Sequence, residues 1–378
     1  MEFFELCCNY NNYTDKYMEL NFNSHNNQNN NRENKIKNNN INKKINNKNI
    51  NNLSIDINFK EDNNKEIFGL INIGSTCYMN SFLQILFHCD IFLNEIKKFE
   101  NNNYNKVILK NFIKLIKNPY SKKNLYEFKS SLKNISIDYS KYIQNDSQKF
   151  GIDLINELIS EIKNEKYFTI ESEKDTNNTT IIDPKKNYEY FLEKYQNNLI
   201  NLEKMFIINE YRIYEKNYKK QIEFENYINI NLYFPEKNKN NYFIQKYNLK
   251  ELLDFKYKNN NKYKVIKICN FPEILIITIN RAIIEKTIKY YSINLEYPEI
   301  LKLGDYADKN ITESEKIEYS LFGVNKKIGF TENYGHYYCE IKIKNIWYKL
   351  DDLNVTSSID FNNISDEVVG LFYVKNKI

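Results

Sequence analysis

Along residues 67–378 the spacing of the apolar side chains changes once, from a helical to a strand repeat. Two early segments carry an apolar stripe at helical spacing: Met79, Phe82, Leu83 and Leu86, and then Phe150, Leu154, Ile155 and Leu158. Beyond about residue 200 the apolar residues fall into runs typical of strands, at 222–230, 273–279, 319–324, 337–343, 346–350 and 368–374. This order predicts an α+β fold in which the helices come first.

The first 66 residues differ in composition from the rest of the chain. Between Asn21 and Asn52, 17 of 32 residues are Asn. Such a stretch buries too little apolar surface to offset chain entropy, so we expect residues 1–66 to form a disordered leader and residues 67–378 to form the folded domain. Breaks rich in Asn and Lys indicate surface insertions near 101–105, 171–180, 236–241, 258–262 and 305–316.

The composition also disfavours several classes of protein. No window approaches 18 consecutive apolar residues, and the N-terminus lacks a signal-peptide pattern, which disfavours a spanning or secreted protein. Six scattered cysteines without a CxxC pair fit a reducing compartment, cytoplasmic or nuclear. The net charge is only +5 and no nucleic-acid-binding signature accompanies it, so we expect neither nucleic acid nor membrane as a partner. The pattern does not indicate an oligomeric state.

Three histidines are available as a general base. His25 lies in the Asn-rich tract. His88 follows Cys77 by 11 residues in one predicted helix, which places it about 16 Å from that cysteine at 1.5 Å per residue. His336 remains, preceded by Gly335, whose missing side chain would let a substrate backbone approach closely. The alternative for any lone histidine is a purely structural role.

A predicted hairpin supplies a carboxylate for His336. The runs 337–343 and 346–350 flank Lys344-Asn345, a plausible two-residue turn. In that register Asp351 pairs opposite Tyr338 and lies diagonal to His336. A carboxylate there could orient the imidazole, as in a nucleophilic triad.

Among the six cysteines, Cys77 has the most distinctive position. It follows Gly74-Ser75-Thr76, a turn with a candidate hydroxyl cap, and it opens the predicted amphipathic helix 77–88. The N-terminal field of that helix is expected to favour the thiolate. The alternative is a cysteine that merely starts a helix.

Four segments together resemble the signature motifs of ubiquitin-specific proteases, the papain-like deubiquitinating enzymes. The longest is 68–84, FGLINIGSTCYMNSFLQ, which resembles the family's cysteine box. Gly335-His336-Tyr337 followed by 347–352, WYKLDD, resembles its histidine box. The segments 144–150, QNDSQKF, and 271–281, FPEILIITINR, resemble the start of a thumb helix and the strand that enters the palm.

The resemblance implies a role for each matching residue. Cys77 would be the nucleophile, His336 the general base and acid, and Asp351 the orienting group. Asn72 matches the donor to the oxyanion, and Asp352 matches a second acidic position near the site. The resemblance assigns substrate binding to a further set: Asp146, Gln148, Lys149, Gly335 and Tyr337.

It also implies a papain-like fold and a thioester mechanism that needs no cofactor. The expected parts are a helical thumb over about 67–200, fingers over about 201–265 and a β-rich palm over about 266–378. Many relatives bind structural zinc in the fingers through two CxxC pairs, and none occurs here, which predicts shortened, zinc-free fingers. The implied partner is ubiquitin or a ubiquitinated protein.

Two departures from the family pattern bear on specificity and stability. Lys149 replaces the usual Glu, and we expect its side chain to pair with Asp146 and weaken recognition of an arginine-rich tail. A protease for another ubiquitin-like modifier is therefore the alternative, and an inactive ubiquitin-binding scaffold is a further one. Gly151 stands where an apolar residue is usual and is expected to weaken the helix by roughly 0.5–1 kcal/mol.

Overall fold

The computed structural model describes most of the chain from residue 67 onwards. The described residues are 67–100, 106–163, 184–191, 193, 200–216, 219–235, 246–259, 265–284, 288–290, 292–310, 316–329 and 335–376. The predicted leader at 1–66 and the predicted insertions at 101–105, 171–180 and 236–241 lie outside them.

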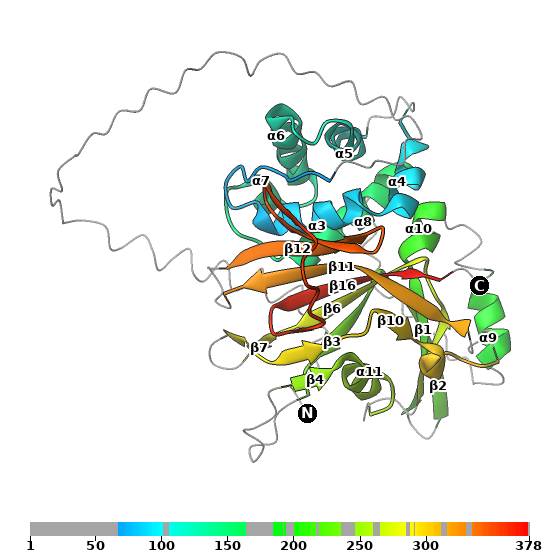
Figure 1. Cartoon of the computed structure of the whole chain (residues 1–378). Coiled ribbons are helices and arrows are strands. Elements are labelled where there is room, and N and C mark those ends of the chain that lie inside the picture. Colours follow the sequence, from blue (N-terminus) through cyan, green and yellow to red (C-terminus); the bar gives the residue numbers. More distant parts are fainter. Residues whose placement is uncertain are drawn as a thin grey trace, which may run out of the picture. The chain divides into compact units, whose positions relative to one another are not determined.

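Helices precede strands, as the apolar spacing predicts (Figure 1). The described α-helices are α3 (Cys77–Phe87), α4 (Asp90–Lys97), α5 (Val107–Lys117), α6 (Lys122–Ser131), α7 (Ile137–Ser140), α8 (Ser147–Lys163), α9 (Pro184–Phe191), α10 (Asn201–Phe206) and α11 (Leu249–Tyr257). Two short 3₁₀ helices are η1 (Leu132–Asn134) and η3 (Gly304–Tyr306). Within the described ranges no helix is long and apolar enough to cross a membrane.

The described strands range from two to eleven residues. They are β1 (Ile208–Lys216), β2 (Lys219–Tyr227), β3 (Asn229–Tyr233), β4 (Lys246–Asn248), β5 (Val265–Asn270), β6 (Ile274–Asn280), β7 (Ala282–Ile284), β8 (Ile288–Tyr290), β9 (Asn294–Glu296), β10 (Ile300–Lys302), β11 (Glu318–Ile328), β12 (His336–Ile343), β13 (Ile346–Asp351), β14 (Asn354–Ser357), β15 (Ile364–Ser365) and β16 (Val368–Lys375). Each predicted apolar run lies mainly within a strand.

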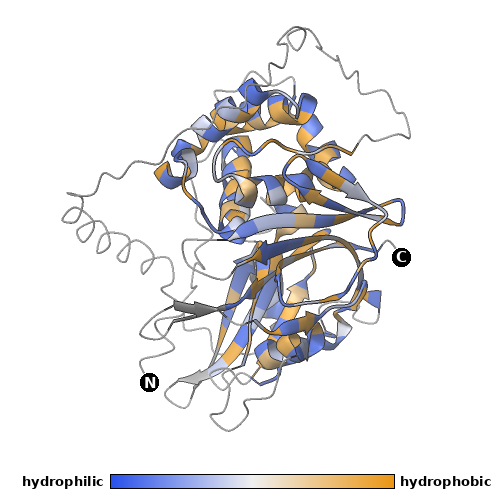
Figure 2. Ribbon diagram, turned by 60° about the vertical axis from the view of Figure 1, so that its left-hand side comes forward, coloured by the Kyte–Doolittle hydropathy of each residue, from blue (hydrophilic) through white to orange (hydrophobic). Residues whose placement is uncertain are grey.

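An eight-stranded sheet organises the domain. Its order is β14-β13-β12-β11-β16-β6-β3, with β10 added beside β11, and only the β3–β6 pair is parallel. Helices α3 and α8 lie on one side of this sheet and α11 on the other (Figure 1). Each side buries its own apolar cluster, and the helices carry mixed polar and apolar surfaces (Figure 2). The sheet therefore has two covered faces, which explains why β6 and β16 read as continuous apolar runs.

Helix α3 is buried on every side, whereas its apolar spacing predicted an amphipathic helix. All eleven of its residues are buried, including the polar Asn80, Ser81 and Gln84. Each of these polar side chains has a hydrogen-bond partner: the Asn80 amide donates to the carbonyl of Ile71 at 3.2 Å, and the Gln84 amide donates to that of Phe68 at 2.8 Å. Asn80 and Gln84 thus fix the segment that precedes Cys77, and Ser81 bonds within the helix and to Ser147 of α8.

Gly151 allows α8 to pack closely on α3. A Cβ atom at this position would lie 2.0 Å from the ring of Phe82, a distance that no side chain tolerates. The ring of Phe82 in turn packs edge-on against Phe372 of the sheet, with centroids 5.3 Å apart. The close packing of α8 on Phe82 therefore offsets the cost that a glycine brings to a helix, and the sequence did not predict this packing.

A separate three-stranded sheet, β2-β1-β5, occupies the region where fingers are expected. It includes β5, which begins at the expected boundary near residue 265 and pairs with β1. Its apolar cluster consists of Tyr188, Tyr211, Ile222 and Cys269. Cys269 serves here as a buried packing residue, and its thiol faces the carbonyl of Asn209 at 3.4 Å.

Buried charges connect this sheet to α11. Glu210 of β1 is fully buried and forms ion pairs with Lys256 at 3.1 Å and with Arg212 at 3.4 Å. Arg212 also pairs with Glu225 at 2.6 Å, and the hydroxyl of Tyr257 donates to Glu210. Removing one member of such a network leaves the others buried without compensation.

We therefore expect Glu210→Gln to lower the free energy of unfolding by about 3 kcal/mol and the melting temperature by about 5–10 °C. Burial by itself would raise the pKa of Glu210, but Lys256 and Arg212 outweigh it and hold the pKa below its ordinary value of 4.5. This stabilisation is complete above the unfolded value and is lost as the pH falls through the folded one. Denaturation of both proteins at several pH values should show their difference narrowing in acid.

The matched control is Glu318→Gln, which removes a carboxylate from a surface pair with Lys302 at 3.0 Å. Since Lys302 is 75% exposed, the control should change stability by less than about 1 kcal/mol. Equal effects of the two substitutions would contradict a special role for the buried network.

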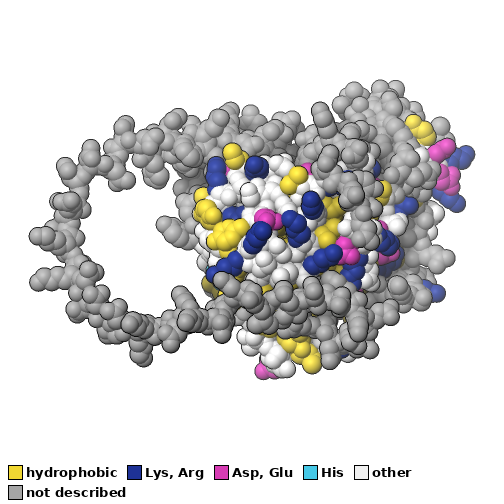
Figure 3. Space-filling view, turned by 90° about the horizontal axis from the view of Figure 1, so that it is seen from above, with side chains coloured by type: hydrophobic (Ala, Val, Ile, Leu, Met, Phe, Trp, Pro, Cys, Tyr) yellow, Lys and Arg dark blue, Asp and Glu magenta, His cyan; other side chains and the backbone are white. Residues whose placement is uncertain are grey.

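The helical face carries both signs of charge. Seen from the side of α5 and α6, lysine and arginine side chains lie among acidic and apolar ones (Figure 3). Lys114 pairs with Glu127 at 2.9 Å and Lys117 with Glu100 at 2.6 Å. Exposed pairs of this kind contribute little to stability.

Candidate active site

Cys77 is the first residue of α3, at the point where this helix meets the sheet. The segment before it lies along the turn between β13 and β14, because the N–H of Leu70 donates to the carbonyl of Asp352 at 2.9 Å. A Cβ atom at Gly69 would lie 2.4 Å from the backbone of Leu353, so only glycine permits this approach. The cysteine segment and the end of β13 are therefore held together.

Asn72 is oriented by its own neighbours. Its Oδ1 accepts from the N–H of Gly74 at 3.0 Å and of Thr76 at 3.2 Å, which assigns the other end of the amide as the nitrogen. Nδ2 donates to Oδ2 of Asp352 at 3.0 Å. The Thr76 hydroxyl accepts from the N–H of Ile73 and bonds Asn72, so it does not cap α3, contrary to the sequence-based expectation.

His336 and Asp351 meet as the predicted hairpin requires. Lys344 and Asn345 both have positive φ angles, 48° and 65°, as in a type I′ turn. The pairing of Ile343 with Ile346 and of Cys339 with Leu350 confirms the predicted register. Nε2 of His336 lies 2.5 Å from Oδ1 of Asp351.

Asp352 joins these residues to Asn72. Single ligand atoms of His336, Asp351 and Asp352 all lie within 4.8 Å of one another. Asn80 of α3 donates to Oδ1 of Asp352 at 2.8 Å, while Asn72 donates to Oδ2. The carboxylate of Asp352 thus bridges two amides and keeps the Asn72 side chain in place. His336, Asp351 and Asp352 are also the only three His, Cys, Asp or Glu residues among those described whose ligand atoms lie close enough together to hold a metal ion.

Cys77 lies beside the strand that begins with His336. The backbone N–H of Tyr337, the residue after His336, faces the Cys77 thiol. Burial raises the pKa of this thiol and the Asp352 carboxylate raises it further, whereas the N–H groups of Tyr337 and Tyr78 lower it. Burial is the largest of these effects, so the pKa of the thiol lies above its ordinary value of 9.0, although the start of a helix by itself favours the thiolate.

The side chain of Gln144, which lies shortly before α8, reaches both Cys77 and the residue before His336. Its amide nitrogen donates to the carbonyl of Gly335 and lies 4.0 Å from Sγ of Cys77. The sequence comparison included Gln144 in a motif but assigned it no role. The available signal was its position two residues before Asp146, in a segment already matched to the start of α8.

The residues expected to bind substrate are divided between the surface and the interior. Asp146 is exposed, and its carboxylate caps α8 by accepting from the N–H of Lys149 at 2.8 Å. The ammonium of Lys149 pairs with Asp153 at 3.1 Å, so the expected pairing with Asp146 is wrong. Gln148 is buried beneath the sheet, where Gly370 leaves room for it and Thr278 lies 3.5 Å away.

Gly335 and Tyr337 flank His336 and differ in exposure. Gly335 is partly exposed, and a Cβ atom there would lie 2.7 Å from the carbonyl of Gly329 and 2.7 Å from Cε of Lys327. Tyr337 is buried and belongs to the apolar cluster around α3. Lys327, which the sequence comparison did not single out, therefore lies directly beneath the residue before the histidine.

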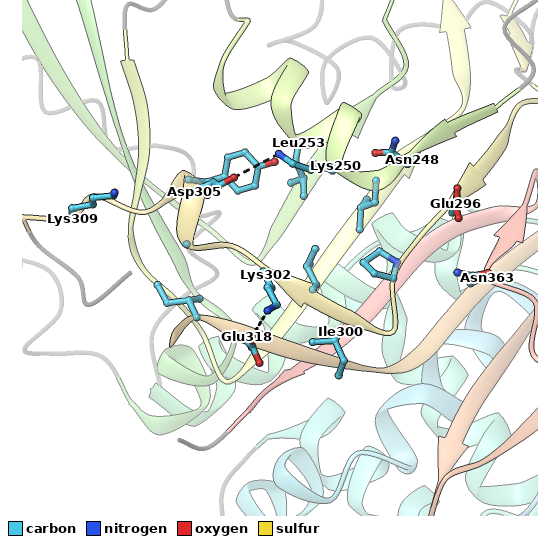
Figure 4. Close-up of a pocket in the computed structure, with 16 residues that line it drawn as sticks. Asn248, Lys250, Leu253, Glu296, Ile300, Lys302, Asp305, Lys309, Glu318 and Asn363 are labelled. Carbon is cyan, nitrogen blue, oxygen red and sulfur yellow. Dashed lines mark ion pairs between the residues drawn. The ribbon is translucent and has the colours of Figure 1, made fainter. Parts of the chain in front are cut away.

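A cavity of about 690 Å³ lies elsewhere, between α11, η3 and β10 (Figure 4). Its charged groups largely pair with one another: Lys302 with Glu318 at 3.0 Å, and Lys250 with Asp305 at 3.6 Å. None of the residues that line it belongs to the set around Cys77. The chemistry-bearing residues and this cavity are thus separate.

A cysteine at the start of a buried helix, beside a histidine that bonds a carboxylate, defines a cysteine hydrolase with a papain-like arrangement. The sequence profile of the ubiquitin carboxyl-terminal hydrolase family matches residues 68–373. The chain belongs to this family and is a cysteine-type ubiquitin hydrolase.

Individual relatives agree with this assignment. Ubiquitin carboxyl-terminal hydrolase 4 of Arabidopsis thaliana is 25% identical over 317 residues, which cover 76% of this chain and 84% of the relative. The human ubiquitin carboxyl-terminal hydrolase 42 is 33% identical over 84 residues, 22% of this chain and 6% of that protein. Among solved structures, the fold is similar to the SAGA DUB module of Ubp8, Sgf11, Sus1 and Sgf73 bound to monoubiquitin, with a TM-score of 0.63 at 20% identity over 82% of this chain and 69% of that one.

Proposed function

We propose that this chain hydrolyses the isopeptide or peptide bond after the C-terminal glycine of ubiquitin, with Cys77, His336 and Asp351 as its triad. The observation that carries the proposal is the contact of the Cys77 thiol with the N–H of Tyr337, next to a histidine whose Nε2 is 2.5 Å from Asp351. The ubiquitin-bound Ubp8 module, with its similar fold, supports the choice of substrate.

The reaction then runs in two halves. His336 takes the proton of Cys77, and Sγ attacks the glycine carbonyl to form a tetrahedral oxyanion. The C–N bond breaks as His336 returns the proton to the leaving amine, which leaves a thioester. His336 next removes a proton from water, whose oxygen attacks the thioester carbon. The C–S bond then breaks, the Cys77 sulfur takes that proton back from His336, and the new carboxylic acid releases its own proton to solvent as a carboxylate. Every proton lost by one group is accepted by another, so no cofactor is needed.

Asn72 is suited to stabilise the oxyanion. Its amide donates one N–H to Asp352 and carries a second N–H that can serve the developing charge. Because its Oδ1 accepts from two backbone N–H groups, the amide does not need to reorient during the reaction. Asp352 acts through Asn72 by fixing that amide.

The state of the cysteines indicates the kind of cellular compartment in which the protein acts. Among the described residues Cys77, Cys89, Cys269 and Cys339 are buried and form no disulfide. Four thiols outside any disulfide fit a reducing compartment, so cytoplasm or nucleus is part of the proposal.

Ubiquitin that bears a C-terminal electrophile tests the function directly. We expect one adduct per chain, located on Cys77 by peptide mass spectrometry. The same electrophile on a ubiquitin-like modifier with a less basic tail is the matched probe, since it tests the alternative substrate. An adduct with that modifier alone would transfer the activity to it, and no adduct with either probe on folded protein would contradict the proposal.

A further inference from the structure

Lys327 is a lysine enclosed at the inner face of the sheet. It lies on β11 and pairs with Tyr337 on β12. Directly paired residues of antiparallel strands face the same side, and Tyr337 belongs to the cluster around α3. The ammonium lies 5.4 Å from the centroid of the Tyr337 ring, and only 8% of Lys327 is exposed. The side chain therefore points toward the layer that contains Cys77.

Hydrogen bonds hold three elements together at this place. Asn325, two residues before Lys327 on the same face of β11, donates to the Ser147 hydroxyl at 2.6 Å. That hydroxyl donates to the carbonyl of Tyr78 at 2.7 Å. The starts of α3 and α8 are thus joined to β11, and Cys77 and Asp146, which precede Tyr78 and Ser147, lie near Lys327.

The charges around Lys327 agree with this placement. Burial lowers the pKa of the Lys327 ammonium, while the Asp146 carboxylate and the Cys77 group both raise it. The carbon chain is equally confined, because its Cε lies only 2.7 Å from where a Cβ of Gly335 would be. A confined ammonium in a poorly solvated place acts more strongly on its neighbours than one in water.

We propose that Lys327 is a positioning residue whose fixed positive charge stabilises the thiolate of Cys77. The inference rests on the proposed role of Cys77 as nucleophile. The thiolate is otherwise disfavoured by burial and by Asp352. An ammonium held near Cys77 offsets both effects and makes the proton easier for His336 to remove.

Other titratable groups near Cys77 and Lys327 also affect how stable the thiolate is. They are Tyr78 on α3, Asp146 before α8, His336 on β12, and Asp351 and Asp352 at the end of β13. At neutral pH Lys327 is a cation, and so is Lys349 of β13, which pairs with Asp351 at 3.5 Å.

Alkylation of Cys77 by iodoacetamide measures its thiolate without any ubiquitin. We expect Lys327→Met, which keeps the length of the carbon chain, to slow alkylation of the Cys77 peptide about three- to tenfold between pH 7 and pH 9. Lys327→Arg should restore the rate. The difference should vanish above about pH 10.5, the ordinary lysine value, because the wild-type ammonium then loses its charge.

The control is Lys342→Met, which removes a lysine from β12 that pairs with Glu299 at 2.6 Å. It should leave the alkylation rate of Cys77 unchanged. A folded Lys327→Met protein with the wild-type rate would overturn the proposal, and so would a deficit that persists above pH 10.5, since that deficit would reflect access to the thiol.

A wild-type measurement decides the case in which Lys327→Met does not fold. A cation beside the thiolate attracts the anionic iodoacetate more than the neutral iodoacetamide. The alkylation rate of Cys77 by iodoacetate, divided by its rate by iodoacetamide, should fall as the salt concentration is raised from about 0.01 M to 1 M. A ratio independent of salt would overturn the proposal. Because neither reagent involves ubiquitin, failure here is distinguishable from failure of the proposed function.

Discussion

Cys77→Ala is expected to lower hydrolysis of a fluorogenic ubiquitin substrate by about 10⁴-fold or more while ubiquitin still binds. The thiol supplies the bond that becomes the thioester, and an alanine side chain cannot form that bond. Cys77 itself is only 4% exposed, so its sulfur contributes little contact area for ubiquitin. Turnover and the dissociation constant for ubiquitin should be measured on the same preparation.

Cys89→Ala is the matched control for this experiment. Cys89 is also buried and forms no disulfide, and it lies at the other end of α3, between that helix and α4. Its removal should reduce stability slightly and leave turnover within about twofold of wild type. Retained turnover in Cys77→Ala, or equal losses in both variants, would contradict the proposed mechanism.

The fold and the hairpin of the site were accessible from the sequence because they depend on local pattern. Apolar spacing alone separates helices from strands, and a two-residue turn allows one register for its two strands. The positions of His336 and Asp351 follow from that register without any tertiary information. Their 2.5 Å contact is therefore predictable from residues 336–351 alone.

What the sequence could not supply depends on burial and on competition for partners. A helix N-terminus favours a thiolate locally, but the pKa of Cys77 is raised because the whole domain packs around it. Lys149 was expected to pair with Asp146, three residues earlier on the same helix. The Asp146 carboxylate instead caps α8 by accepting a hydrogen bond from the backbone N–H of Lys149. The ammonium of Lys149 forms its ion pair with Asp153.

Lys327 could not be found by the same reasoning. In the sequence, residues 329–335 separate β11, which carries Lys327, from β12, which begins with His336. A connection of that length allows the two strands to pair in several registers. Only the observed pairing of Lys327 with Tyr337 brings it to the face that meets α3. Long-range register, rather than residue type, is thus the information that was missing.

His88→Ala separates a structural histidine from a catalytic one. His88 ends α3, where its Nδ1 lies 2.7 Å from the carbonyl of Gln84 and its ring packs on Phe68 with centroids 5.2 Å apart. Its removal should lower the free energy of unfolding by about 1–3 kcal/mol, through the lost packing and hydrogen bond. Turnover of the folded fraction should remain within about twofold of wild type.

His336→Ala should instead lower turnover by about 10⁴-fold and change stability little, because this side chain is 38% exposed and its main partner is Asp351. The pH dependence identifies the cause. Without an imidazole to accept its proton, Cys77 reacts only in the fraction that is already a thiolate. Since burial raises the pKa of that thiol above its ordinary value of 9.0, residual turnover should keep rising through the alkaline range where the wild-type rate has levelled off. A pH-independent residual rate, or a comparable loss in folded His88→Ala, would show that His336 is not the base.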